Sequence, residues 1–357
     1  MPDIQGLAHL SWSPVGREDR DRVAQLVRRC ENYDHAMRTL TSQELDTMVA
    51  ASPAKPTGSE PSTVVDIASV GAELVAVVEV SIAPAPSNTA ENEEADHLEP
   101  ASAESGLDRT RRIYPRVWVA PEARTSSVVE QVIARVDSLI GTVLPQPEGE
   151  IVTEFLIDHR FTWLSDVLVA NGFHRVRKFE LMYRDLDSEP LVSRHDDTRY
   201  RIVTWDDTRL DEIRRVHLAA FTDHWGSATD ADMWWSIACT RVEPRWSYLA
   251  VDEDDRVVGY FIVGNPREHS ERIGIREAYA EILGVSRDHR GGGLARALLA
   301  AGEQAARADG VSRFGLDVDT DSPSGANTFY QRCGFVPVGS EDVWLRTGAP
   351  ITAFTRK

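Results

Sequence analysis

Apolar and polar residues change their spacing along the second half of the chain, from the twofold alternation of strands to the three-to-four spacing of helices. Residues 200–204 predict a short strand, and residues 209–220 predict an amphipathic helix. Residues 247–251 and 257–263 are mainly apolar runs on either side of an acidic turn, which predicts a β-hairpin. A further strand is predicted at 278–285. These elements indicate a sheet with helices packed on it.

The last third of the chain continues this alternation. A helix follows the strand at 278–285, because apolar residues recur there at spacings of four, three and four and define one buried face: Leu294, Leu298, Ala301 and Ala305. Residues 313–319 alternate like a half-buried strand. Ser322 and Pro323 then fit the N-cap and first position of another helix, which Gly334 ends.

The first half of the chain shows the same order of predicted elements. Two pairs of segments anchor the comparison: residues 119–129 align with 285–295, and residues 167–176 align with 329–338. Identity between the halves is low, so we infer a duplication from the element order and these two anchors.

The duplication divides the chain into two expected domains, residues 1–190 and 191–357. Each is predicted to be an α/β domain, with a central mixed sheet and helices on both faces. Residues 84–111 are rich in Pro, Ala, Ser and Glu and low in aromatic residues, a composition typical of disorder. We therefore expect a disordered insertion there in the first domain.

Charge and apolar content narrow the classes of partner. The formal net charge of −18 argues against nucleic acid or an anionic membrane surface as the main partner. No apolar run approaches the roughly 20 residues needed to cross a bilayer. The first residues also lack the basic start and apolar core of a secretion signal. We expect a cytoplasmic protein; a monomer and a homodimer both stay open.

The three cysteines, Cys30, Cys239 and Cys333, are far apart in the chain. Their number and spacing fit neither a disulfide framework nor a CxxC metal site, so we expect buried apolar side chains. Asp288 and His289 adjoin each other but have no third ligand at a suitable spacing, and no metal is predicted.

The segment HRGGGLARALL, residues 289–299, joins three glycines to a helix start. The first N–H groups of a helix have no internal acceptor and lie at the positive end of its dipole. Three consecutive glycines lose much conformational entropy, which is justified where the backbone must be bare. Gly291, Gly292 and Gly293 therefore predict a phosphate site. The loop stands too late in its domain for a dinucleotide motif, and no Gly-Lys-Ser/Thr follows as in a P-loop.

Residues 285–295, VSRDHRGGGLA, resemble the Arg/Gln-x-x-Gly-x-Gly/Ala signature of the GNAT superfamily of acyl-CoA-dependent N-acetyltransferases. Arg290, Gly293 and Ala295 occupy its three fixed positions. The resemblance covers roughly residues 200 to 350. The arrangement in two units is similar to the tandem-GNAT group that includes mycothiol synthase.

A second motif supports the resemblance. The stretch DVDTDSPSGANTFYQRCGFVPVG is similar to the closing motif of the family, in which a Tyr precedes a Gly-Phe pair. Tyr330, Gly334 and Phe335 match this pattern. Ser322 stands where the family has Asn, a departure that weakens one expected contact to the pantetheine arm.

The resemblance implies acetyl-CoA as the co-substrate. Its pyrophosphate would rest on the backbone of the residues around the loop: Arg290, Gly291, Gly292, Gly293, Leu294 and Ala295. Its pantetheine arm would run like an added strand beside Leu283, Gly284 and Val285. Ser322 is the further expected contact.

The resemblance also implies that an amine attacks the thioester directly, in a ternary complex. Glu281 is the candidate base, since it lies on the same strand as Val285 and shares its face; an ordinary exposed strand glutamate is the alternative. Tyr330 is the implied proton donor to the leaving thiolate, with a packed core tyrosine as the alternative. Asp317 and Asp319 could bind or deprotonate the amine, or form a solvated strand face.

A Trp-rich stretch lies between the first strand and the hairpin of the second half, where GNAT proteins usually build the acceptor pocket. Its residues could hold a cation or could simply belong to the core. They are Asp223, His224, Trp225, Gly226, Asp230, Asp232, Trp234 and Trp235.

In the first half, Arg124 aligns with Arg290, but the other residues aligned with these sites have a different chemistry. Pro115 aligns with Glu281 and Leu168 with Tyr330, while the three glycines align with Thr125, Ser126 and Ser127. We predict a structural first domain; a regulatory ligand site is the alternative.

The favoured function is an N-acetyltransferase that acts on a primary amine of a small molecule. One alternative is the acetylation of a cysteinyl amine, as in mycothiol synthase. The alternative from another class is a non-catalytic protein that binds or senses acyl-CoA. Glu281 and Tyr330 favour the enzyme.

Overall fold

The computed structural model describes residues 9–36, 39–51, 62–82, 111–144, 150–192, 199–221, 230–321 and 325–348, with the main chain alone at 230–234 and 236. The chain forms two compact units. Unit 1 comprises Met1–Val176 and Asp342–Lys357, and unit 2 comprises Arg177–Glu341. The predicted insertion at 84–111 lies outside the described residues, apart from Arg111.

The described part of unit 1 includes these strands, which follow one another in chain order along its sheet: β1 (Ser11–Pro14), β2 (Ser62–Val70), β3 (Glu73–Ile82), β4 (Arg111–Val119) and β5 (Ile151–Asp158). Neighbours are antiparallel except for the parallel pair β4–β5. Its helices are α1 (Arg20–Asp34), α2 (Ser42–Ala50), α3 (Ser126–Val143) and α4 (Thr162–Ala170). Most residues of β3 are buried, which matches its nearly continuous apolar sequence.

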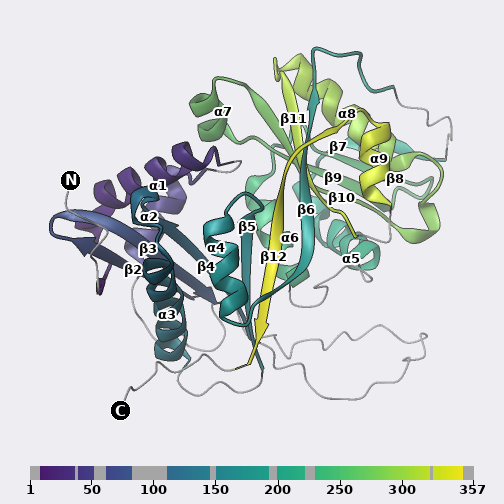
Figure 1. Cartoon of the computed structure of the whole chain (residues 1–357). Helices are drawn as coiled ribbons and strands as arrows, with labels where there is room; N and C mark the ends of the chain where they lie inside the picture. The colour runs from purple at the N-terminus through teal and green to yellow at the C-terminus, as the bar shows by residue number, and fades with distance from the viewer. Residues whose placement is uncertain are drawn as a thin grey trace. The chain divides into compact units, whose positions relative to one another are not determined.

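Unit 2 has the sheet order β6-β11-β10-β9-β8-β7 (Figure 1). Its strands are β6 (His174–Asp185), β7 (Arg201–Thr204), β8 (Tyr248–Val251), β9 (Val257–Gly264), β10 (Glu277–Val285) and β11 (Arg313–Asp319). Its helices are α5 (Leu210–Phe221), α6 (Asp230–Arg241), α7 (Arg267–Ile273), α8 (Leu294–Ala308) and α9 (Ala326–Arg332). The pair β10–β11 is parallel and the other recorded pairs are antiparallel, so the sheet is mixed as predicted.

Two apolar cores lie on the two faces of this sheet. Along β9, Phe261 and Val263 belong to the core that includes Leu298 of α8. Tyr260 and Ile262 belong to the other core, which also holds residues of α5 and α6. Because alternate residues of a strand face opposite sides, β9 is buried on both faces. This arrangement confirms the predicted α/β class.

The units divide the chain differently from the expected domains. The long strand β6 pairs with β11 from Arg313↔Asp185 to Asp319↔Phe179, and this ladder joins residues from Arg177 onward to unit 2. At the other end, β12 (Val336–Thr347) passes out of unit 2, and Asp342 onward belongs to unit 1. Both differences come from strand pairing over long sequence separations, which local periodicity does not reveal.

A buried ion pair attaches β6 to α8. Arg184 Nε donates to Glu303 Oε2 at 2.8 Å, and only 2% of the Glu303 side chain is exposed. The same carboxylate accepts from the Leu191 backbone and from Arg307, each at 2.9 Å. Three donors therefore compensate the desolvation of this buried charge.

We predict that Glu303→Ala lowers the free energy of unfolding by about 3–5 kcal/mol, because it leaves Arg184 buried without its partner. Urea denaturation measures the change. Glu271→Ala, at an exposed position on α7, is the matched control and should change it by less than about 0.5 kcal/mol. A loss below about 1 kcal/mol for Glu303→Ala would contradict the role of the pair.

Candidate active site

The glycine loop connects the end of β10 to the start of α8. The short turn η5 (Arg287–His289) follows β10, and α8 begins at Leu294. Gly291 and Gly293 have φ angles of 83° and 87°, a left-handed conformation that favours glycine. Gly292 has no such requirement, and a Cβ built there meets no atom within 4 Å. Its lack of a side chain is therefore not explained by local conformation or packing.

The start of α8 presents backbone donors beside this bare loop. The first intrahelical bond runs from Ala297 N to Gly293 O at 3.0 Å, so the N–H groups of residues 294–296 precede it. Gly293 is the N-cap and has no side chain to cap them. The geometry is suited to an anion at the positive end of the helix dipole.

Arg290 has a different place from the rest of the loop. Its Nε donates to Val285 O and its Nη2 donates to Ala220 O, both at 2.9 Å. Its backbone N–H donates to Arg287 O at 3.2 Å. These contacts attach the loop to the end of β10 and to the last turn of α5. The Arg290 amide, which the sequence assigned to the pyrophosphate, thus donates within the turn.

Strands β10 and β11 separate halfway along β10. Their recorded pairing runs from Glu277↔Arg313 to Ala280↔Leu316, whereas β10 continues to Val285 and β11 to Asp319. On its other edge, β10 stays paired with β9 as far as Val285↔Gly259. In the described strands, the edge of β10 after Ala280 is thus open toward β11. An open edge offers backbone donors and acceptors to an extended ligand.

This open edge contains the residues predicted to accompany the pantetheine arm. Leu283, Gly284 and Val285 are opposite Phe261, Tyr260 and Gly259 of β9. The backbone groups of alternate residues point to opposite edges of a strand, and the Val285 carbonyl, which accepts from Arg290, points away from β9. Ser322, the other predicted contact, lies outside the described residues.

Glu281 lies where the two strands begin to separate, at an irregularity between Ala280 and Ile282. Its side chain is 12% exposed, and its carboxylate lies 3.6 Å from Arg241 of α6. A Cβ on Gly264 would approach Glu281 Oε1 to 2.6 Å, so this glycine leaves the room that the carboxylate occupies. Glu281 is therefore not an ordinary exposed strand glutamate.

Tyr279 and Asp317 share this face of the sheet. Tyr279 is directly opposite Gly264, over which the Glu281 carboxylate lies. The Tyr279 hydroxyl donates to Asp317 Oδ2, which links β10 to β11 beside the gap. Asp319, by contrast, is buried 3.9 Å from Arg177. The sequence analysis did not identify Tyr279, Gly264 or Arg241. Tyr279 could have been identified, because it lies two residues before Glu281 on the same strand.

Tyr330 lies on α9 among aromatic rings. Its ring centroid is 5.1 Å from that of Phe329 and 5.7 Å from that of Phe335. Burial raises the pKa of the Tyr330 phenol above its usual value of 10.0, and the neighbouring Cys333 acts in the same direction. The phenol is therefore protonated at neutral pH. The packing of Tyr330 against Phe329 and Phe335 is therefore compatible with a role as proton donor.

The Trp-rich stretch is described only in part. Trp235 lies 5.0 Å from the His217 ring and 5.9 Å from the Tyr260 ring, and His217 Nδ1 is 2.6 Å from the Tyr260 hydroxyl. Trp235 thus belongs to the core between α5, α6 and β9. The predicted residues at 223–226 lie outside the described chain, and at 230, 232 and 234 only the main chain is described.

Unit 1 contains the counterpart of the Arg290 contact. Arg124 Nε donates to Val119 O at 3.0 Å, five residues back along the chain, just as Arg290 does to Val285. The Arg124 guanidinium also makes two bonds of 2.6 Å to Asp34, the last residue of α1. The following helix is capped by Thr125, whose hydroxyl accepts from Val128 N at 3.4 Å. In unit 1, a side chain thus accepts from a backbone N–H at the helix start. In unit 2, Gly293 has no side chain that could do so.

Among the described residues, no group of three or more His, Cys, Asp or Glu side chains comes together in a way that could hold a metal ion. None of the described helices combines the length and apolar character needed to cross a membrane. Cys30 and Cys333 are buried, as predicted, and Cys239 is half-buried.

Residues 210–335 match the family model described as the Acetyltransferase (GNAT) family. The mycothiol acetyltransferase of Actinosynnema mirum is 32% identical over 174 residues, which are 48% of this chain and 56% of that protein. The mycothiol acetyltransferase of Propionibacterium freudenreichii is 31% identical over 176 residues, covering 48% and 54%. The matches thus span about half the length of these relatives.

Solved structures extend the likeness to the whole fold. A GCN5-related N-acetyltransferase from Sphaerobacter thermophilus has a TM-score of 0.66 at 19% identity, covering 99% of this chain and 100% of its own. A tandem GNAT protein from the clavulanic acid biosynthesis pathway has a TM-score of 0.63 at 18% identity, covering 95% and 98%. Residues 210–335, within the C-terminal unit, are therefore similar to the GNAT family of acetyltransferases, and the chain shares its fold with a tandem GNAT protein.

Proposed function

We propose that unit 2 transfers an acetyl group from acetyl-CoA to a primary amine of a small molecule, by direct attack in a ternary complex. The observation that carries this proposal is the open edge of β10, which leads from Glu281 to the glycine loop. It offers one continuous track for a ligand with a phosphate end and a long, amide-bearing arm.

The residues present fit acetyl-CoA along this track. The diphosphate would lie against the bare backbone of Gly291 to Gly293 and the first amides of α8. The pantetheine amides would bond to those backbone groups of residues 283–285 that point away from β9. From Val285 to Glu281 the strand spans ~13 Å, which brings the far end of the arm toward the carboxylate.

In the proposed reaction, the amine nitrogen bonds to the thioester carbonyl carbon and the carbon–sulfur bond breaks. Glu281 accepts a proton from the amine, held in place by Arg241. Tyr330, whose phenol is protonated at neutral pH, donates a proton to the sulfur. Tyr279 and Asp317, on the same sheet face as Glu281, would contact the acceptor.

We propose that unit 1 is structural and that each chain has one acetyl-CoA site. Thr125 caps α3 where unit 2 has bare glycines. Pro115 stands at the position of Glu281, and the fully buried Leu168 at that of Tyr330. Pro115 and Leu168 can neither accept a proton from the amine nor donate one to the thiolate.

A second candidate acceptor is a cysteinyl amine, because the relatives named above are mycothiol acetyltransferases. The non-catalytic alternative has less support. A protein that only binds acyl-CoA does not need a carboxylate beside the ligand. Glu281 is such a carboxylate, and it is largely buried.

Glu281→Gln is expected to lower kcat by roughly 10²–10⁴-fold, because the amide keeps the shape but cannot accept a proton. Thiol release from acetyl-CoA with a panel of small primary amines, cysteinyl amines included, measures the rate. Acetyl-CoA affinity should stay unchanged, as should the rate of the control Glu271→Gln. A wild-type rate in Glu281→Gln would refute the base role.

Tyr330→Phe is expected to lower kcat by roughly 10²-fold or more while preserving the packing on Phe329 and Phe335. The donor is active when protonated, so activity depending on it persists below its pKa and is lost only as the pH rises through it. Because that pKa is raised above 10.0, the wild-type kcat should show no decline from this group up to pH 10. A descending limb near pH 8 that Tyr330→Phe removes would contradict this assignment.

A further inference from the structure

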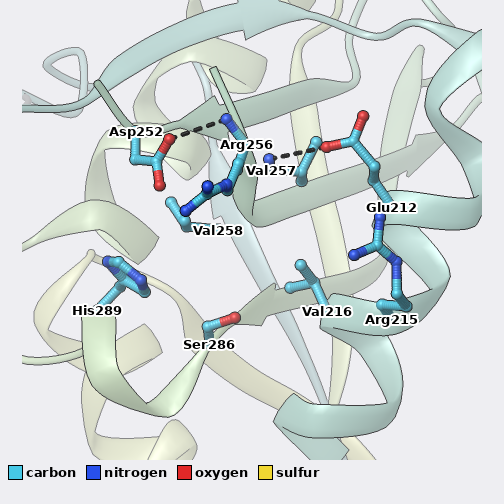
Figure 2. Close-up of a pocket in the computed structure, with 9 residues that line it drawn as sticks. All are labelled: Glu212, Arg215, Val216, Asp252, Arg256, Val257, Val258, Ser286 and His289. Atoms are coloured by element: carbon cyan, nitrogen blue, oxygen red, sulfur yellow. Dashed lines mark hydrogen bonds between the residues drawn. The ribbon is translucent and has the colours of Figure 1, made fainter. Parts of the chain in front are cut away.

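The two ends of the open β10 edge differ in the space beside them. Beyond Val285, a pocket of about 380 Å³ lies next to Ser286, the first residue after β10. Figure 2 shows this pocket between α5, the first residues of β9 and the segment after β10. At the opposite end, the pair Ala280↔Leu316 joins β10 to β11 and closes the gap. A co-substrate whose phosphates lie on the glycine loop would have its acyl group at this closed end.

The Tyr279 side chain crosses from β10 to β11 at the closed end of the gap. Tyr279 is opposite Gly315, one residue before the last recorded pair. A Cβ built on Gly315 would lie 3.1 Å from Tyr279 Cδ2, so the ring passes over this glycine. The Tyr279 hydroxyl then donates to Asp317, one residue beyond the last pair. The side chain therefore lies across the end of the gap, on the sheet face that holds the Glu281 carboxylate.

A second tyrosine fills the space behind Tyr279. Tyr183 of β6 is opposite Gly315, and its Cε1 would lie 2.7 Å from a Cβ built on that glycine. The Arg313 guanidinium lies 3.9 Å from the centroid of the Tyr183 ring, and it donates two bonds of 2.8 and 2.6 Å to the buried Glu277. The stacked guanidinium holds the Tyr183 ring in place. The two tyrosine rings thus share the space above Gly315.

The other face of the sheet is closed by the apolar core. Ala280 and Leu316 lie on the face opposite Tyr279, because alternate residues of a strand face opposite sides. They are 8% and 1% exposed, and both belong to the core that includes Leu298 of α8. A packed core does not accept added methylenes without strain. The direction that is left for a longer acyl chain leads past Glu281, where the amine must approach.

We propose that Tyr279, supported by Tyr183, limits the length of the acyl group, so that unit 2 transfers acetyl and rejects butyryl and longer chains. The inference rests on the proposed function, because it takes the thioester to lie at the closed end of the gap. Tyr279 is then a specificity-determining residue for the acyl donor, in addition to its contact with the acceptor.

The test compares kcat/KM for acetyl-CoA and butyryl-CoA in the full chain, with one fixed acceptor amine. Wild type should prefer acetyl-CoA by about 100-fold or more, because the added methylenes have no space. In Tyr279→Ala this preference should fall by at least about 10-fold. Tyr279→Phe is the matched control; it keeps the ring over Gly315 and should retain the preference. Because the acceptor is the same for both donors, a change in acceptor binding cancels from the ratio.

A second strand and a second readout support the test. Tyr183→Ala opens the space behind Tyr279 and should also lower the preference. Titration calorimetry should show weaker binding of butyryl-CoA than of acetyl-CoA by wild type, and a smaller difference in Tyr279→Ala. The Tm of each variant reports whether it folds. If Tyr279→Ala does not fold, Tyr279→Leu, whose side chain is too short to reach Asp317, replaces it with the same expected shift.

The outcomes separate this inference from the proposed function. Equal kcat/KM for the two donors in wild type would overturn the inference and leave acetyl transfer in place. A preference that survives in both Tyr279→Ala and Tyr183→Ala would also overturn it. A loss in Tyr279→Phe as large as in Tyr279→Ala would show that the hydroxyl decides, and would contradict a steric limit. Failure of wild type to bind acetyl-CoA, or to acetylate any amine, would overturn the proposed function itself.

Discussion

The separation of β10 from β11 after Ala280 is the constraint on which the rest of the site depends. A parallel ladder continued to Val285 would use the backbone groups that an extended ligand needs. Continued pairing with β9 keeps β10 in the sheet while its other edge stays open. The irregularity at Glu281 lies where the strands part, and Gly264 leaves space for its carboxylate. The candidate base is therefore placed by the same local geometry that separates β10 from β11.

The two units share a scaffold and differ at the helix start. In each, an arginine side chain donates to the carbonyl five residues before it and also contacts the last turn of the first long helix of its unit. This repeated contact is structural support for the duplication inferred from element order. Unit 1 then caps its helix with the Thr125 side chain, whereas the N-cap of α8 in unit 2 is Gly293, which has no side chain. A common scaffold thus carries the proposed site in one unit and a helix start capped by its own side chain in the other.

Features encoded locally could be predicted, and features that depend on distant partners could not. The spacing of Leu294 and Leu298 predicted α8, and the three glycines predicted a bare loop at its start. The place of β6 in unit 2 depends on its pairing with β11, more than a hundred residues away, for which no local pattern exists. The burial of Glu281 depends on α6 and on Gly264 in another strand. The bond from Tyr279 to Asp317 likewise joins two strands whose register the sequence does not reveal.

The most direct test of the account is the stoichiometry of acetyl-CoA binding, measured by titration calorimetry on wild type, Gly292→Leu and Ser126→Leu. Gly292 has neither a strained φ nor a neighbour near its Cβ, so leucine there should leave the fold unchanged and cover the backbone. Ser126 is the aligned position in unit 1. The account predicts one site per chain, lost in Gly292→Leu with an unchanged Tm and kept in Ser126→Leu. Two sites in wild type, or full binding by Gly292→Leu, would contradict it.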